Sequence, residues 1–194
     1  PSDDPPLKPG RDPGGFAVAI LADGFDYTKP ALAAVLARDG EGEAIAWDAV
    51  DEDARPFEVD GHGTHEALAV AAHGGVRIVQ VRIARSDRAS LARGIAFAVQ
   101  TPAKIVFLPH TAQDAEGRTI LTAAAKKFAH VLFVRESGKP DNGDPEHDAA
   151  NLLILAPDAR ERSPASRIAH ALGCGRDTLD GTSGADLRSA LLRR

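Results

Sequence analysis

Short apolar runs recur along the chain and constrain its fold more than any other feature. They are nearly continuous in branched aliphatic residues and lie at 18–21, 78–81, 105–108, 131–134 and 152–155. Strands of a parallel sheet are covered on both faces and therefore look like this. Helical patterns lie between the runs, at 30–38, 62–73, 90–99 and 119–129. The alternation predicts an α/β fold with a mostly parallel sheet flanked by helices in three layers.

The length of the chain fits one domain. Its 194 residues, 43% of them hydrophobic, are enough for a single substantial core. Residues 1–15 contain five prolines and are expected to form an extended tether. The domain is then expected to span 16–194. Its final helix should start near Ser183 and turn Leu187, Leu191 and Leu192 inward.

Composition restricts the partners of the chain. The formal net charge is −5 and the basic residues are scattered, so a nucleic-acid partner is not expected. No apolar run reaches the roughly 18 residues of a membrane span. The single Cys174 excludes an intrachain disulfide framework. A protein or peptide partner remains. Because the chain starts with Pro1 and not Met, we expect a removed targeting segment and a periplasmic or secreted location.

Two glycine-bounded segments carry the residues with chemical potential. Asp-Gly-His-Gly-Thr-His at 60–65 places His62 at the start of a buried helix, where the helix dipole disfavours the imidazolium and keeps a ring nitrogen available as a base. Gly-Thr-Ser at 181–183 presents the hydroxyl of Ser183 at another helix start. Each residue also has an ordinary interpretation, as a capping residue. Together they indicate nucleophilic catalysis.

These motifs resemble those of the subtilisin-like serine proteases, the subtilases. That family has a Gly-His-Gly-Thr-His motif, found here at 61–65, and a Gly-Thr-Ser-Met-Ala-x-Pro motif, of which only Gly-Thr-Ser is found, at 181–183. The resemblance extends from Phe16 to Leu192. It implies a subtilisin-like fold and a serine endopeptidase ancestry, with His62 as general base and Ser183 as nucleophile. It implies no cofactor, and we expect no dedicated metal site.

The acidic member of the family's triad does not match cleanly. Alignment of the first apolar run places Ala22 at the position of the catalytic aspartate, and Asp23 one residue later. Since side chains alternate along a strand, we expect Asp23 to point away from the imidazole unless the strand bulges. A mutated Asp-Asp-Gly would give the same sequence, so Ala22 is either a natural loss or an inactivating substitution.

Other departures affect substrate binding and oxyanion stabilisation. Pro109 removes a backbone donor from the strand that pairs with substrate in the family. Lys139 occupies the position of the family's oxyanion-stabilising asparagine, with Asn142 available only after realignment of the loop. Gly-Ala-Asp-Leu at 184–187 replaces Met-Ala-x-Pro. The resemblance therefore implies a degenerate site.

Three hypotheses follow. The first is a subtilisin-like domain that is catalytically impaired or inactive, either a pseudoprotease used for binding or scaffolding or an Asp-to-Ala inactivated form. The second is an active serine endopeptidase with Ser183 as nucleophile, His62 as base and Asp23 as a shifted acid. Another carboxylate, such as Asp26, would be an alternative acid.

The third hypothesis is a metal site. It would use His62, His65 and His110, because His-x-x-His spacing can place two ligands on one helix face. If the chain is instead a binding module, the contact surface is expected between Ser86–Arg93 and Pro109–Gln113.

Overall fold

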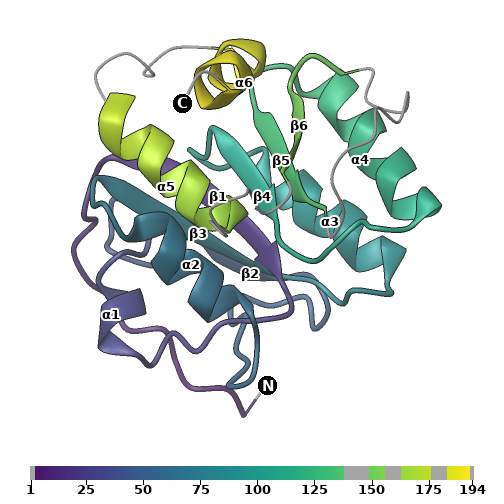
Figure 1. Ribbon diagram of the computed structural model, residues 1–194. Coiled ribbons are helices and arrows are strands. Elements are labelled where there is room, and N and C mark those ends of the chain that lie inside the picture. The colour runs from purple at the N-terminus through teal and green to yellow at the C-terminus, as the bar shows by residue number, and fades with distance from the viewer. Residues whose placement is uncertain (1–2, 138–148, 156–162, 176–182, 193–194) are drawn as a thin grey trace.

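The computed structural model describes residues 3–137, 149–155, 163–175 and 183–192. A six-stranded sheet forms the centre, with strand order β2-β3-β1-β4-β5-β6 and every pairing parallel (Figure 1). The strands are β1 (Phe16–Ala22), β2 (Ala46–Asp48), β3 (Val76–Arg82), β4 (Ile105–Leu108), β5 (Leu132–Glu136) and β6 (Leu152–Leu155). The predicted α/β class and mostly parallel sheet are confirmed.

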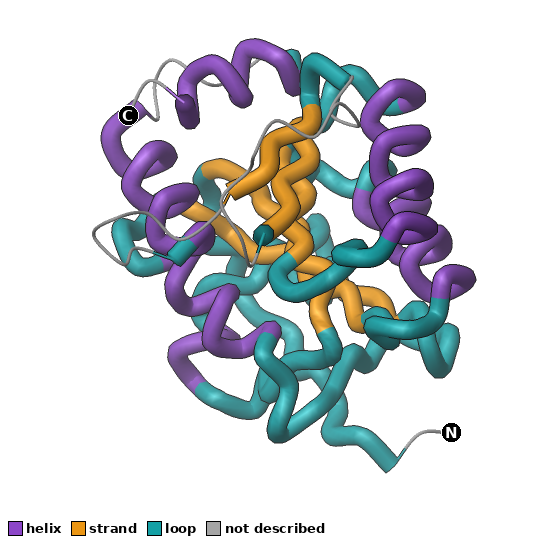
Figure 2. Tube along the Cα trace, turned by 45° about the vertical axis from the view of Figure 1, so that its right-hand side comes forward, coloured by secondary structure: helices purple, strands orange, loops and turns teal. Residues whose placement is uncertain are grey.

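Helices cover both faces of this sheet (Figure 2). They are α1 (Pro30–Ala33), α2 (Gly63–Ala71), α3 (Arg88–Ala98), α4 (Ala115–Lys127), α5 (Pro164–Gly175) and α6 (Gly184–Leu192). Alternate residues of β1 separate the two cores. Val18 and Ile20 pack with α1, α2, α5 and α6, whereas Ala19 and Leu21 pack with α3 and α4. The result is three layers, helix, sheet and helix, as the sequence predicts.

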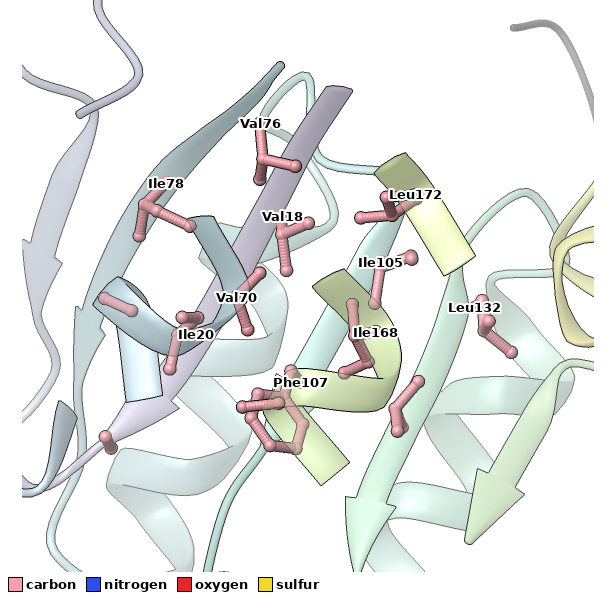
Figure 3. Close-up of a cluster of buried hydrophobic side chains, with 14 of the residues drawn as sticks. Val18, Ile20, Val70, Val76, Ile78, Ile105, Phe107, Leu132, Ile168 and Leu172 are labelled. Atoms are coloured by element: carbon pink, nitrogen blue, oxygen red, sulfur yellow. The ribbon is translucent and has the colours of Figure 1, made fainter. Parts of the chain in front are cut away.

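Two elements were missing from the sequence prediction. Strand β2 has only three residues and gives little periodic signal. Helix α5 buries Ala165, Ile168 and Leu172, an i, i+3, i+7 pattern, against the core face that includes Val18 and Ile105 (Figure 3). None of the described helices is long and apolar enough to cross a membrane.

The N-terminal segment, which the sequence predicts to be an extended tether, lies on the domain through several hydrogen bonds. The Tyr27 hydroxyl donates to the carbonyl oxygen of Pro5 at 2.7 Å. The Arg38 guanidinium donates to the carbonyl oxygen of Lys8 at 2.9 Å. The Asp12 carboxylate accepts from the backbone of Arg38 and from the side chain of Arg77. Residues 3–12 are thus a docked strap on the domain surface.

The final helix agrees with the prediction except at its end. Leu187 and Leu191 are buried against the sheet, whereas Leu192 is 56% exposed. Leu192 was predicted to face inward, and this is wrong because α6 ends at that residue, beyond the edge of the core.

Strand order locates the edge at which a site is expected. The helices that follow β1 and β2 lie on one face, and those that follow β3 and β4 lie on the other. The connections therefore diverge on either side of the β1–β4 pair. Ligands of open α/β sheets bind at the carboxyl ends of the strands at such a switch point.

Candidate functional site

Asp23 and His62 meet at this carboxyl edge. The backbone N–H of His62 donates to Asp23 Oδ1 at 2.8 Å, and His62 Nδ1 lies 3.2 Å from Asp23 Oδ2. The expectation that Asp23 points away from the imidazole is wrong. Strand β1 ends at Ala22, so the alternation of side chains stops one residue before Asp23. Ala22 itself is 2% exposed and packs in the apolar core.

Glycines bring the two segments this close. A Cβ on Gly61 or on Gly63 would lie 2.5 Å from the carbonyl oxygen of Gly24. Thr64 secures the same contact, because its hydroxyl accepts from the backbone N–H of Asp26 at 2.7 Å. The Gly-His-Gly-Thr motif thus has a structural purpose, which is to hold the His62 backbone against the turn after β1.

Arg85 contacts both members of the pair. Its Nη2 lies 2.7 Å from Asp23 Oδ2 and 2.9 Å from His62 Nδ1. Partial burial raises the pKa of the Asp23 carboxyl. The hydrogen bond from the His62 backbone and the charge and hydrogen bond of Arg85 oppose this effect, and the pKa is lowered overall. Asp23 is therefore held ionised, and Arg85, which sequence reasoning did not single out, is its closest cationic partner.

His110 extends the cluster from the end of β4. Its ring lies 5.7 Å from that of His62, centroid to centroid. Its Nδ1 lies 2.9 Å from a carboxylate oxygen of Glu136, and its Nε2 lies 3.8 Å from Glu66. Burial, and then the charge of Glu136, raise the pKa of the Glu66 carboxyl. His110 has φ 53°, so the backbone is strained at the point where it carries this side chain into the cluster.

The metal hypothesis gains no support from this cluster. His65 is exposed on α2. Among the described residues, no group of three His, Cys, Asp or Glu side chains is arranged to hold a metal ion.

Ser183 lies at the opposite edge of the sheet from His62. The backbone N–H of Gly184 donates to the carbonyl oxygen of Ala129, just before the start of β5. The Ser183 hydroxyl donates to the Asp186 carboxylate at 2.7 Å and accepts from the Asp186 backbone. This is a reciprocal helix cap at the start of α6. The structure therefore does not bring Ser183 and His62 together.

A different serine, Ser163, lies at the same edge as His62. Helices α2 and α5 pack against each other, and a Cβ on Gly173 would lie 3.1 Å from that of His73. Ser163 precedes Gly173 by ten residues, and His62 precedes His73 by eleven. Each residue therefore lies about 15 Å along its helix from this contact, toward the start of the helix. In Figure 3, Leu172 lies toward the start of β4 and Ile168 further along it, so α5 begins at the carboxyl edge.

The local sequence of Ser163 shares one feature with the family's serine motif. Ser163-Pro164-Ala165 retains the Ser-x-Ala of the Ser-Met-Ala motif, but Glu161 and Arg162 precede it in place of Gly-Thr. The Ser163 hydroxyl is half-buried and accepts from the backbone N–H of Ser166 at 3.2 Å. No hydrogen bond links it to His62 within the described ranges. A serine followed by Pro and a helical apolar pattern was the available signal.

Two of the remaining predicted site residues cannot be placed, and the two segments of the expected contact surface lie close together. Lys139 and Asn142 lie outside the described residues. Gly173-Cys174-Gly175 form the end of α5. Ser86–Arg93 and Pro109–Gln113 lie near each other, since the Arg88 guanidinium pairs with Asp114, next to the second segment.

Comparisons with known proteins support the same fold. A cold-adapted subtilisin-like serine proteinase aligns with a TM-score of 0.58 and 13% identity, over 94% of this chain and 82% of that one. The patellamide maturation protease PatG aligns with a TM-score of 0.51 and 15% identity, over 94% and 84%. No family model and no curated protein matches the sequence. The chain has a subtilisin-like fold.

Proposed function

We propose that this subtilisin-like domain is catalytically impaired and serves to bind a protein or peptide. The observation that carries the proposal is the contact of Arg85 with both Asp23 and His62. In a serine protease, the carboxylate accepts a hydrogen bond from the Nδ1–H of the histidine, which keeps the proton on Nδ1 and leaves Nε2 free to take the proton of the serine hydroxyl. Arg85 competes with the histidine for the carboxylate, and with the carboxylate for His62 Nδ1.

The competition follows from donor and acceptor chemistry. A guanidinium only donates hydrogen bonds, so a hydrogen bond across its 2.9 Å contact with His62 Nδ1 needs a ring without a proton on this nitrogen, whereas a hydrogen bond to Asp23 needs a proton there. We propose that the contact with Arg85 prevails. The neutral ring is then protonated on Nε2, which cannot accept a proton from a serine. A histidine fixed in the wrong tautomer costs a serine protease about 10⁴ in turnover. In this tautomer, the contact with Arg85 would by itself suppress efficient hydrolysis.

The surroundings of Ser163, the serine at the same edge of the sheet as His62, also support an impaired site. The Ser163 hydroxyl is used as a helix cap, and the sequence before it lacks the family's Gly-Thr. The alignment expected from the sequence puts Lys139 at the place of the family's oxyanion-stabilising asparagine, with Asn142 available only after realignment of the loop. Loss of one such donor costs on the order of 10² to 10³ in turnover.

An active serine hydrolase is the second candidate, and the Asp23–His62 contact favours it. Here Ser163 replaces Ser183 as the nucleophile, because Ser163 shares an edge of the sheet with His62. His62 remains the base and Asp23 the acid. This candidate requires that Arg85 leave the pair when substrate binds. Arg85 has 47% of its side chain exposed, which leaves room for such a movement.

Labelling with a fluorophosphonate probe separates the two candidates. The chain is compared with Arg85→Ala, with Ser163→Ala, and with Arg118→Ala as a control for loss of a partly exposed arginine that donates to the carbonyl oxygen of Gln113. An impaired domain labels slowly, and Arg85→Ala labels faster at Ser163. Rapid labelling of the unaltered chain at Ser163, with no gain from Arg85→Ala, would establish the active hydrolase.

Peptide binding is tested separately. Peptides selected from a random display library on the immobilised chain are remeasured with Arg88→Ala, which alters the proposed contact surface, and with Lys126→Ala, near the end of α4 and outside that surface. A specific loss with Arg88→Ala supports the proposed surface. Equal binding by both variants would exclude it.

A further inference from the structure

A pocket of about 460 Å³ lies between the docked strap and the domain, away from the His62 site. Its volume is within the roughly 300 to 1,000 Å³ that is typical of small-molecule sites. One wall is the strap and the other is α1 with its flanking residues. The lining residues are Pro5, Pro6, Leu7, Lys8, Pro9, Tyr27, Thr28, Pro30, Ala33, Leu36 and Arg38.

The walls of this pocket are held in place before any ligand binds. Pro5, Pro6 and Pro9 have a restricted φ and keep the strap extended. The Tyr27 hydroxyl fastens the strap at Pro5, and the Arg38 guanidinium fastens it at Lys8. Burial raises the pKa of the Tyr27 phenol to about 12, so this group stays a neutral donor at physiological pH. A ligand would therefore enter a preformed site with little ordering cost.

The lining combines apolar surface with charge of one sign. Prolines, leucines and Ala33 supply most of it, and both charged lining residues are basic. The Arg38 guanidinium is 7% exposed and already donates to the carbonyl oxygens of Lys8, Gly42 and Ala33. Lys8 has no ion-pair partner among the described residues. A positive charge thus remains uncompensated beside an apolar pocket.

We propose that this pocket binds a medium-chain carboxylate, with its acyl tail between the strap and α1 and its carboxylate toward Lys8. The apolar lining would shield the tail from water. The two basic residues favour an anionic over a cationic head group. Most lining atoms offer no hydrogen bond, so the tail length sets the affinity and the charge sets the selectivity. This proposal is independent of the proposed function and does not involve His62, Asp23 or Arg85.

Isothermal titration of the full chain with decanoate tests the proposal. Saturable binding of one decanoate per chain is expected. Octanoate, shorter by two methylenes, should bind roughly tenfold more weakly. Decyltrimethylammonium has the same tail and the opposite charge, and it should not compete. Absence of saturable decanoate binding, or equal binding of the decyl cation, would overturn the proposal.

Two variants connect the binding to this pocket. Ala33→Leu places extra carbons in the pocket and should abolish decanoate binding, with the thermal melt used to verify that the domain is folded. Lys8→Gln, at an exposed position, should weaken decanoate up to about fivefold. Lys29→Gln is the matched control, since Lys29 is a nearby lysine that does not line the pocket. Decanoate affinity that neither Ala33→Leu nor Lys8→Gln changes would also overturn the proposal.

Discussion

The side-chain amide of Gln80 is fully buried in the middle of β3, and neither its nitrogen nor its oxygen has a hydrogen-bond partner among the described residues. Its neighbours in the adjacent strands are Ile20 and Ala46. Burying such an amide without partners costs about 1 to 3 kcal/mol on protein mutational scales. Methionine has a similar shape and no strong hydrogen-bonding group. We therefore expect Gln80→Met to raise the free energy of unfolding by about 2 kcal/mol.

Urea denaturation and thermal melts measure this effect. For a domain of this length, about 2 kcal/mol corresponds to a rise of roughly 4 to 8 °C in the melting temperature. The matched control is Gln100→Met. Gln100 is exposed and donates to the carbonyl oxygen of Ala96, so its replacement should change stability by less than about 0.5 kcal/mol. A lower free energy of unfolding for Gln80→Met would refute the reasoning, because it would mean that the amide is satisfied in the folded protein.

Three further predictions concern the site and its supports. Gly63→Ala should lower the free energy of unfolding by 2 kcal/mol or more, on the order of other severe steric changes, because its Cβ would meet the Gly24 carbonyl; Gly40→Ala, with open space around it, should be nearly neutral, and equal effects would contradict the packing argument. Ser183→Ala should cost about 1 kcal/mol as a lost helix cap and leave fluorophosphonate labelling unchanged; loss of labelling would restore Ser183 as the nucleophile. Because the folded-state pKa of Asp23 is lowered, its ionised form stabilises the fold above the ordinary pKa of 3.8 and this contribution is lost as the pH falls through the folded-state pKa. The difference in unfolding free energy between the chain and Asp23→Asn should therefore shrink in acid, as urea melts at pH 7 and pH 3 would measure, and a constant difference would contradict the lowered pKa.

Much of the fold could be predicted from the sequence because buried parallel strands leave a strong signal. Ile105–Leu108 and Leu152–Leu155 have the predicted bounds. β1 and β3 extend beyond theirs by one or two residues at each end, and β5 starts one residue later and ends two residues later than predicted. Helix α5 was missed although its apolar pattern is regular. The Gly-Thr-Ser at 181–183 directed the search for a serine to that segment, and Gly173 and Gly175, at the end of α5, are poor helix formers.

The site was less predictable because it depends on which strands are neighbours. The pairing of His110 with Glu136 requires that β4 and β5 lie side by side, which the sequence does not state. The reach of Asp23 depends on β1 ending at Ala22. Arg85 is one of many scattered arginines until β3 is placed next to β1. Motif recognition found His62, and only the helix packing indicated Ser163.

The tautomer of His62 tests the central claim most directly. Nitrogen-15 NMR of the imidazole at neutral pH, assigned by comparison with His62→Gln, distinguishes a proton on Nδ1 from a proton on Nε2. The account predicts Nε2–H in the unaltered chain and a change to Nδ1–H, hydrogen-bonded to Asp23, in Arg85→Ala. A proton on Nδ1 in the unaltered chain would contradict the account, because Arg85 would then not be blocking the base and the pair would be ready for catalysis.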